Sequence, residues 1–413
     1  MTSADRWMTA FAAALADPGD TLPFMPRPQS FRGQTIRQAV RLRRGGGRLR
    51  LVLSNEFGRT PLVFDEVTAG VGDEPSRPML LRGSHRWEIP PGQVAVGDPV
   101  ALPAQADHEL AVACYVAGEA GPAAFLHSAQ RTGHAAPGNQ AGRTLGEEFD
   151  GAQPFTSLYW ISRVLTDIES STETSTGAEG PVIVALGDSI TRGDGTTVDG
   201  EQRYPDHLQA RLLAAGMTGA VVLNLGLGAN RLLRPQVGPP MIERFDRDVL
   251  GAGPALRDDP PNPLRTTPAE ASHVIIMGGI NDLGLPGLLG GQVPAAEQII
   301  DALFGLARRA ARRGVQPVLG TLTPILASRF DSFRAAGNED IRQAVNRAIL
   351  TQDEWPAADF AAAVADRADP SRIAAAFDSG DGVHPGDEGA RALADSIDLT
   401  VFRQAVTAAR LQR

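Results

Sequence analysis

A serine and a distant aspartate–histidine pair have side chains suited to nucleophilic catalysis. Gly187-Asp188-Ser189 follows the apolar run 182–186, and the stretch Asp381-Gly382-Val383-His384-Pro385 lies near the end of the same half. A serine hydroxyl needs an imidazole to accept its proton, and the imidazole needs a carboxylate to fix its tautomer. The sequence therefore predicts a catalytic triad of Ser189 as nucleophile, His384 as base and Asp381 as orienting carboxylate.

Taken singly, each of these motifs is compatible with an ordinary turn. Gly-Asp-Ser after a strand is a common polar turn, and Asp381-Gly382 is a typical turn dipeptide. The context favours catalysis, because Gly187 permits a sharp turn after a buried strand and Asp381 can reach the imidazole three residues later. The chain contains no Gly-x-Ser-x-Gly sequence, which disfavours the nucleophile elbow of common α/β-hydrolases.

Asn281 is a candidate for stabilising the negative charge that forms on a carbonyl oxygen when a serine attacks it. It follows an apolar run and Gly278-Gly279-Ile280, and its side-chain amide can donate to that oxyanion. The backbone N–H groups of Ser189 and of the Gly228-Ala229 turn could complete the oxyanion hole. The alternative is that Asn281-Asp282 forms only a turn.

Composition excludes several other kinds of chemistry. All 39 basic residues are arginine, so Schiff-base chemistry, P-loop nucleotide binding and a Ser-Lys dyad are excluded. The only cysteine, Cys114, lies in an apolar run typical of a buried strand and is interpreted as an inert core thiol. No zinc or calcium-loop spacing occurs, so neither a metal nor a cofactor is predicted.

Bulk properties favour a soluble protein of two domains. The chain has 413 residues, of which 42% are hydrophobic, and a formal net charge of -9. This length exceeds what one core usually serves, and no apolar run approaches the length of a membrane span. The negative charge offers no general attraction to phosphate backbones. We therefore expect no integral membrane segment and no nucleic-acid partner.

The first part of the chain, residues 1–165, has the pattern of a β domain. The alternation in Leu49-Arg50-Leu51-Val52-Leu53 and the regular Gly and Pro turn signals predict a β-sandwich-like fold. Residues 166–180 are rich in Ser, Thr and Glu and are predicted to be a linker. The strand candidates in this domain are residues 35–42, 48–54, 94–102 and 109–116.

The apolar run from Trp7 to Ala16 has two interpretations. Its Ala-Leu-Ala ending is typical of a signal peptide, but the residues before it lack a positive cluster. Because Ser3 can cap an amphipathic helix, we favour a folded helix and a cytoplasmic protein. Secretion is the alternative if residues 1–16 act as, or replace, a signal peptide.

From residue 181 to 413 strands alternate with helices, which predicts an α/β domain with a parallel sheet covered by helices on both faces. Ligands bind beyond the carboxyl ends of such strands. Ser189, Asn230 and Asn281 each follow a strand candidate, so we expect them to converge on one rim. The strand candidates are residues 182–186, 220–225, 273–277 and 315–322, and the helical ones are 204–215, 295–313 and 339–350.

Residues 231–271 interrupt this alternation with a Pro-rich stretch, 254–268 in particular. The segment is too long for a plain connection between a strand and a helix. It is predicted to be either a lid or a wall of the substrate cleft.

Four segments occur in the order and approximate spacing of the SGNH hydrolases, also called GDSL esterases, and the chain resembles that family. They are Gly187-Asp188-Ser189, residues 224–230, Gly279-Ile280-Asn281-Asp282 and Asp381-Gly382-Val383-His384. The segments 35–38, 53–58, 243–248, 320–324 and 378–382 look like those of a bacterial subfamily with an added N-terminal β domain. The resemblance covers nearly the whole chain.

The resemblance implies a flavodoxin-like three-layer α/β/α hydrolase domain that uses Ser189, His384 and Asp381 as the triad. It also implies an oxyanion hole made by the Ser189 N–H, a glycine N–H of the second segment and the Asn281 side chain. The chain departs from the family at Ala229, where related sequences have the glycine. The backbone N–H survives this replacement if the residue needs no positive φ, and the alternative is a shifted turn in which Gly228 donates.

The leading hypothesis for function is a serine esterase for short acyl groups, such as acetyl esters of a carbohydrate or small molecule. A lipase or lysophospholipase is the alternative, with residues 283–289 lining an apolar trough. A carbohydrate-binding protein with a weak hydrolase domain is another, and an acyltransferase would use the same acyl-enzyme. The aromatic residues of the β domain are interpreted as core rather than a sugar platform: Trp87, Tyr115, Phe125, Tyr159 and Trp160.

Overall fold

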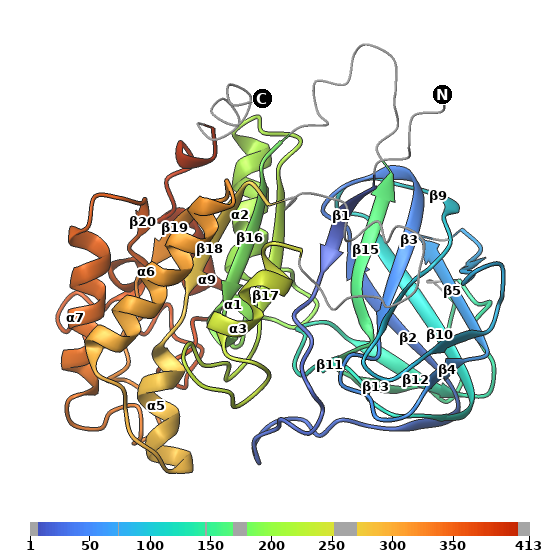
Figure 1. The fold of residues 1–413 in the computed structure, drawn as a ribbon, viewed down its shortest axis with the longest axis horizontal. Helices are drawn as coiled ribbons and strands as arrows, with labels where there is room; N and C mark the ends of the chain where they lie inside the picture. The colour runs from blue at the N-terminus through green and yellow to red at the C-terminus, as the bar shows by residue number, and fades with distance from the viewer. Residues whose placement is uncertain (1–6, 73, 145–146, 168–179, 252–270, 404–413) are drawn as a thin grey trace. The chain divides into compact units, whose positions relative to one another are not determined.

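The computed structural model describes residues 7–72, 74–144, 147–167, 180–251 and 271–403 (Figure 1). The chain divides into two compact units, one with the described residues up to 167 and one with those from 180 onward. Most of the predicted linker, 166–180, lies outside the described residues. Its first two residues, Thr166 and Asp167, belong to the last strand of the first unit.

The first unit is built from antiparallel sheets. One sheet has the order β1-β15-β3-β8, with β9 also paired to β3, and another has the order β13-β12-β2-β10-β5-β6. Two short pairs, β4 with β7 and β11 with β14, complete it. The bounds are β1 Trp7–Ala12, β2 Phe31–Arg41, β3 Gly46–Ser54, β4 Leu62–Phe64, β5 Glu66–Val71, β6 Arg77–Pro78, β7 Trp87–Ile89, β8 Val94–Val96, β9 Val100–Ala104, β10 Glu109–Ala120, β11 Phe125–Leu126, β12 Gly133–Pro137, β13 Gln153–Phe155, β14 Leu158–Tyr159 and β15 Ile161–Asp167.

The strands predicted in this unit are confirmed, except that residues 94–102 form two strands, β8 and β9. Four of the five aromatic residues named above are core residues: Trp87, Phe125, Tyr159 and Trp160 are each at most 1% exposed, whereas Tyr115 is half-buried. Burial also raises the pKa of the Cys114 thiol, because a thiolate would lose its hydration there. This agrees with an inert core thiol.

The helix predicted for the N-terminal apolar run is wrong. Residues Trp7–Ala12 form strand β1, which pairs antiparallel with β15. Trp7 packs with Val52 and Leu165, so the side chain buries its apolar surface between neighbouring strands. The alanines of this run favour a helix intrinsically, but pairing with an existing sheet and burial of the Trp7 side chain outweigh that preference. The proposed helix cap, Ser3, lies outside the described residues.

The second unit contains a five-stranded parallel sheet with the order β17-β16-β18-β19-β20. The strands are β16 Val182–Gly187, β17 Val221–Gly226, β18 His273–Met277, β19 Gln316–Gly320 and β20 Ala357–Ala358. The four longer strands match the predicted ones, and all residues of β16 and β18 are buried, as expected for strands covered on both faces. This order, with the second strand placed before the first, is that of flavodoxin-like folds.

The predicted helices of this unit are confirmed as α2 (Tyr204–Ala214), α6 (Ala296–Arg312) and α7 (Asn338–Thr351). Gly216 and Gly314 follow the first two with positive φ values of 82° and 74°, the conformation that ends helices. Further helices are α1 Ser189–Arg192, α3 Met241–Asp248, α5 Ile280–Leu289, α8 Phe360–Val364 and α9 Asp387–Asp395. In Figure 1, α3 and α6 pass in front of the sheet, and α2 packs against α9.

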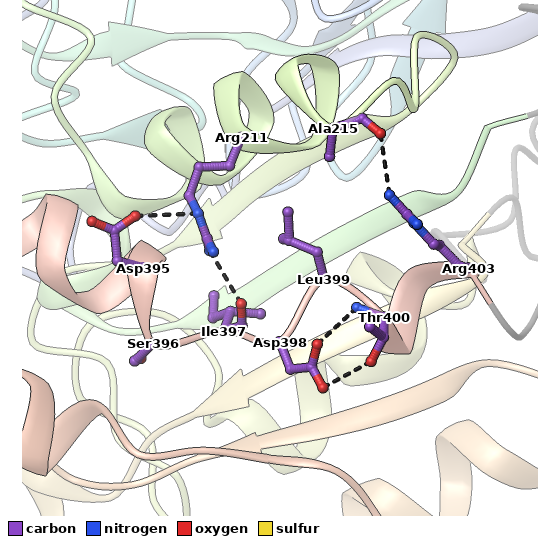
Figure 2. A pocket seen from close by; sticks show the side chains of 9 residues that line it. All are labelled: Arg211, Ala215, Asp395, Ser396, Ile397, Asp398, Leu399, Thr400 and Arg403. Carbon is purple, nitrogen blue, oxygen red and sulfur yellow. Dashed lines mark hydrogen bonds and ion pairs between the residues drawn. The ribbon is translucent and has the colours of Figure 1, made fainter.

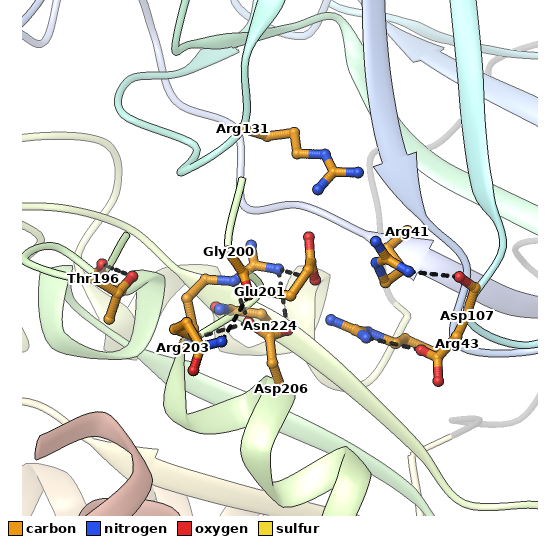
Figure 3. A network of polar contacts seen from close by, with 12 residues as sticks. Arg41, Arg43, Asp107, Arg131, Thr196, Gly200, Glu201, Arg203, Asp206 and Asn224 are labelled. Carbon is orange, nitrogen blue, oxygen red and sulfur yellow. Dashed lines mark hydrogen bonds and ion pairs between the residues drawn. The ribbon is translucent and has the colours of Figure 1, made fainter. Parts of the chain in front are cut away.

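The start of α2 is held by a polar network around Arg203 (Figure 3). Arg203 Nε donates to Asp206 Oδ2 at 2.6 Å, and its Nη2 donates to Glu201 Oε2 at 2.9 Å. The Asp206 carboxylate also accepts from the backbone N–H of Arg203, which satisfies a group that no helical carbonyl can reach. The network therefore fixes where α2 begins.

The segment 231–271, predicted as a lid or cleft wall, is described only in part. Residues 252–270, including the Pro-rich stretch 254–268, lie outside the described residues, and the described part includes helix α3. Within the described ranges, no helix has the length and apolar character needed to span a bilayer. Nor do the described His, Cys, Asp and Glu residues gather in a group that could hold a metal ion.

Candidate active site

Three loops at the carboxyl ends of neighbouring strands carry the residues that were expected to converge on one rim. Ser189 is the first residue of α1 after β16, Asn230 follows β17, and Asn281 is the second residue of α5 after β18. The side-chain Nδ2 of Asn281 donates to the backbone oxygen of Asn230 at 3.0 Å. The parallel sheet thus brings together loops that are separated by 40 or more residues in the sequence.

The imidazole of His384 connects Ser189 to Asp381. Its Nε2 lies 2.8 Å from Ser189 Oγ, and its Nδ1 lies 2.7 Å from Asp381 Oδ2. The other oxygen, Asp381 Oδ1, accepts from the backbone N–H groups of Val383 and His384 at 2.9 Å each. A carboxylate at Nδ1 favours the tautomer in which Nε2 can accept a proton. The arrangement is the one that activation of a serine hydroxyl requires.

The loop that carries Asp381 and His384 is stabilised by hydrogen bonds between its own residues. Asp378 Oδ1 accepts from the backbone N–H groups of Gly380 and Gly382 at 2.9 Å each. Gly382 has φ 72°, and a Cβ at this position would clash with the backbone of Ala327. Glycine is therefore required for both conformation and space. The turn at Asp381-Gly382 exists, and it places the carboxylate beside the imidazole.

Neighbouring carboxylates control the protonation of His384. Burial by itself lowers the pKa of His384, but the hydrogen bond to Asp381 and the negative charges of Asp194, Asp381 and Asp188 together raise it above the usual value. Burial also opposes ionisation of Asp381. Hydrogen bonds from the His384 ring and from two backbone N–H groups nevertheless hold the pKa of Asp381 well below its usual range. Asp381 therefore stays ionised and makes His384 a stronger base.

Gly187 and Asp188 shape the turn before Ser189. The φ of Gly187 is not positive, but a Cβ there would clash with Thr191 Oγ1. Glycine is thus needed for the close approach of α1 rather than for the sharp turn that the sequence suggested. Asp188 Oδ1 caps α1 by accepting from the Ile190 N–H at 3.0 Å. Its Oδ2 has no partner within the described residues, and burial raises the pKa of Asp188 to about 6.

The predicted backbone donors, Gly228 and Ala229, lie in the loop between β17 and Asn230. Within the described residues neither N–H makes a hydrogen bond, so both are available as donors. Ala229 is buried and has φ 54°, a left-handed conformation that costs an L-residue about 1–2 kcal/mol. The condition of a non-positive φ is therefore not met at position 229, and the alanine there is under backbone strain.

Asn281 and Asp282 do not form an isolated turn, because α5 continues through them. The Asp282 side chain is fully buried, and its two oxygens accept from the backbone N–H groups of Leu232 at 2.6 Å and Leu233 at 3.2 Å. Asp282 thus fixes the chain just after Asn230. The Asn281 side chain holds Asn230 itself, so the two adjacent residues anchor one loop to the start of α5.

Two buried arginines near these loops were missed by sequence reasoning. Arg192 pairs with Asp194 through Nε–Oδ1 at 2.8 Å and Nη2–Oδ2 at 2.5 Å, and its guanidinium faces Gly228. Arg244 on α3 contacts both β16 and β17. Arginine is mostly exposed in proteins, so nothing in the residue type signals burial. In the sequence, the segment 243–248 shows only a family resemblance.

A cavity of about 420 Å³ lies elsewhere in this unit, near the ends of α2 and α9 (Figure 2). Its charged side chains are already engaged. Arg211 donates to the Ile397 carbonyl at 3.1 Å and pairs with Asp395 at 3.2 Å, and Arg403 donates to the Ala215 carbonyl at 3.2 Å. The cavity contains none of the residues of the triad and is not the candidate active site.

Comparison with known proteins identifies a family match in this unit. The family model described as GDSL-like lipase/acylhydrolase matches residues 185–392. Among solved structures, a carbohydrate esterase family 2 enzyme with a carbohydrate-binding domain from Corynascus thermopiles (Myceliophthora fergusii) is 13% identical, with a TM-score of 0.42, over 98% of this chain and 100% of that chain. A carbohydrate acetylesterase family member from Sinorhizobium meliloti is 18% identical, with a TM-score of 0.39, over 55% and 99%. No curated protein matches the sequence.

Proposed function

The chain belongs to the GDSL-like lipase/acylhydrolase family and is an ester hydrolase, and we propose that it cleaves short-acyl carboxylic esters through an acyl-enzyme on Ser189. The observation that carries this proposal is the continuous hydrogen-bonded line from Ser189 Oγ through His384 to Asp381. A hydroxyl with a general base at 2.8 Å and a base oriented by a carboxylate is the arrangement needed to form an acyl-enzyme.

In the first half of the reaction, Ser189 Oγ attacks the ester carbonyl carbon while His384 Nε2 takes the hydroxyl proton. The carbonyl oxygen becomes an oxyanion, and the Ser189 N–H can donate to it because the first residues of a helix lack intrahelical acceptors. The Asn281 amide and the backbone N–H of Gly228 or Ala229 are the further proposed donors. Collapse of this intermediate breaks the bond to the alcohol, which leaves with the proton from His384.

In the second half, water replaces the alcohol. His384 Nε2 takes a proton from the water, the resulting hydroxide attacks the acyl carbon, and Ser189 Oγ leaves with the proton that His384 returns. The imidazolium that forms in each half is stabilised by Asp381, whose pKa is held well below its usual range. Asp381 therefore stays ionised throughout and orients the ring rather than accepting its proton.

Burial of α5 supports a short acyl group. The lipase alternative uses residues 283–289 as the lining of an apolar trough, but Leu283 and Leu285 are at most 2% exposed. They pack inside the domain and cannot line a trough for a long chain. Leu288 and Leu289 at the end of the helix are exposed, and two residues offer little apolar area. We therefore propose acetyl or similarly short esters of a carbohydrate or small molecule as substrates.

The aromatic residues named for the β domain do not support the binding-protein alternative. Sugar-binding platforms present aromatic rings to solvent, whereas the rings of Phe125, Tyr159 and Trp160 pack against one another in the core. Transfer of the acyl group to an alcohol stays an alternative to hydrolysis, because both use the same acyl-enzyme. Product analysis in the presence of an added alcohol distinguishes the two.

The experiment that tests the proposal is hydrolysis of p-nitrophenyl esters from acetate to decanoate by the wild type and by Ser189→Ala. We expect a preference for acetate and a loss of activity of about 10⁴-fold or more in the variant. Ser396→Ala is the matched control, because the Ser396 hydroxyl donates to the Leu393 carbonyl in α9 and lies outside the triad; this variant should retain activity.

Three other results of this assay would contradict the proposal. A maximum at long acyl chains would replace the short-acyl proposal by the lipase alternative. Full activity in the folded Ser189→Ala variant would exclude Ser189 as nucleophile. Absence of turnover of every ester by the folded wild type would contradict the proposed reaction on small esters.

A further inference from the structure

Arg244 is a buried cation that lies outside the triad and donates to residues of three different segments. It is carried by α3, its side chain has no exposed area, and all three guanidinium nitrogens are used. Nε donates to Asn230 Oδ1 at 2.9 Å, Nη1 to the Leu225 carbonyl at 3.0 Å, and Nη2 to the Gly187 carbonyl at 2.7 Å. Nη1 also pairs with Asp248 at 2.6 Å, which balances the charge within α3.

The three acceptors belong to the segments that carry the proposed oxyanion-hole donors. Gly187 ends β16 two residues before Ser189, and Leu225 lies at the end of β17 just before the loop that contains Gly228 and Ala229. Asn230 closes that loop and in turn accepts from Asn281 through its backbone oxygen. One rigid, planar group therefore joins the strand that carries the nucleophile to the loop that carries the backbone donors, beside the pairing of β16 with β17.

The loop needs such external support because its local conformation is unfavourable. Ala229 has φ 54°, and a residue in this region keeps its conformation only where the surroundings over-determine it. Asn230 supplies part of that restraint, since its Nδ2 donates to the carbonyls of Val237 and Pro239 at 2.8 Å each. Arg244 holds the opposite end of the same amide through Oδ1. The side chain of Asn230 is thus fixed on both sides.

Packing of α3 does not explain why a charge is buried here. The helix already places Met241 and Phe245 in the core with no exposed area. A buried ion pair is often no more stabilising than apolar residues of the same volume. A guanidinium at this point supplies what an apolar side chain cannot, namely three donors in a fixed plane aimed at three acceptors.

We propose that Arg244 is a positioning residue for the oxyanion hole. It holds the loop 226–230 at a fixed distance from Ser189, so that the backbone donors and the Ser189 N–H point at one oxygen. The inference rests on the proposed function, because it assigns Arg244 to the same reaction. Arg244 itself does not touch Ser189, His384 or Asp381.

The test is Arg244→Lys, which keeps the charge but replaces the planar fork by a single point donor. We expect kcat for p-nitrophenyl acetate to fall between about tenfold and about a hundredfold, as displacement of a catalytic group by about 1 Å does, while KM changes by less than about threefold. The pH midpoint that reports His384 should not move. Arg309→Lys is the matched control, because Arg309 lies on α6 and contacts Ile242 and Asp246 of α3. This variant should leave kcat within about twofold of the wild-type value.

A double-mutant cycle with Asn230→Ala separates positioning from general loss of stability. If Arg244 acts through Asn230, the loss in the double variant is smaller than the product of the two single losses. Additive losses, or an Arg244→Lys enzyme with wild-type kcat, would overturn the proposal. Should Arg244→Lys not fold, Asn230→Ala removes the Nε acceptor together with the two donations from Nδ2 to Val237 and Pro239, and it carries the same expectation for kcat and KM.

Hydrogen–deuterium exchange supplies a readout that needs no activity. The amides of residues 226–230 should exchange faster in Arg244→Lys than in the wild type, and those of α7 should not change. Unchanged exchange in this loop would overturn the positioning role. If the wild type hydrolyses no ester, the proposed function fails, and faster exchange would then still show that Arg244 holds the loop.

Discussion

Gly228 and Arg192 pack so closely that a Cβ at position 228 would overlap the guanidinium group of Arg192. Arg192 cannot move aside easily, because Asp194 holds it with two hydrogen bonds and the Arg192 side chain is only 4% exposed. The loop with the proposed backbone donors therefore packs directly against the guanidinium group of Arg192, whose position is fixed.

Gly228→Ala should accordingly lower both stability and activity. Overpacking of this kind costs about 1–3 kcal/mol, and relief of the clash would shift the loop away from Ser189. Thermal unfolding and kcat for p-nitrophenyl acetate measure the two effects. Gly305→Ala is the control, because a Cβ at that position on α6 meets no atom within 4 Å; a wild-type unfolding temperature for Gly228→Ala would show that the contact is not rigid.

Ala229→Gly should remove strain from the same loop. Glycine adopts φ 54° without the penalty of an L-residue, although it loses more backbone entropy on folding, by roughly 0.5–1 kcal/mol. The net expectation is an unfolding free energy equal to or up to about 1 kcal/mol above that of the wild type, with kcat not reduced. A variant that unfolds more easily by more than about 1 kcal/mol would contradict strain at this position.

The pH dependence of kcat/KM should report the raised pKa of His384. The neutral imidazole is the active base, so activity is lost as pH falls through this pKa, and the midpoint should lie above about 6.5. Asp194→Asn removes one of the charges that raise the pKa and should move the midpoint to lower pH. Asp398→Asn, in the separate cavity, should not move it, and an unshifted midpoint in Asp194→Asn would exclude this electrostatic role.

Asp188→Asn should change stability in a pH-dependent way. The folded-state pKa of Asp188 is about 6, above its unfolded value, so its contribution to stability is present at low pH and is lost as pH rises through about 6. An asparagine cannot ionise, so the substitution removes this loss of stability at high pH. Its effect on the free energy of unfolding should therefore be more favourable at pH 8 than at pH 5 by roughly 1 kcal/mol.

Asp381→Asn is the contrasting variant, with the opposite sign. The Asp381 carboxyl of the wild type has a lowered pKa, so its stabilising effect is present above the unfolded pKa and is lost as pH falls. Urea denaturation of both variants at several pH values measures these differences. Equal effects of Asp188→Asn at pH 5 and pH 8 would rule out a raised pKa at this site.

Much of the second unit could be predicted from the sequence because its signals are local. Buried parallel strands are continuous apolar runs, and Gly216 and Gly314 mark helix ends, so the four longer strands and three helices were found nearly to the residue. The two-residue strand β20 has no such signal. Trp7–Ala12 was assigned wrongly as a helix because its strand exists only through pairing with β15, which lies about 150 residues away.

For the candidate site, the residue types that could act were predictable from the sequence, because this triad needs a serine, a histidine and a carboxylate. Their distances, the positive φ of Ala229 and the burial of Arg192 and Arg244 depend on the folded chain. These properties arise from contacts between loops that follow different strands. A local pattern carries no information on such contacts, because burial and hydrogen-bond partners are set by segments distant in the chain.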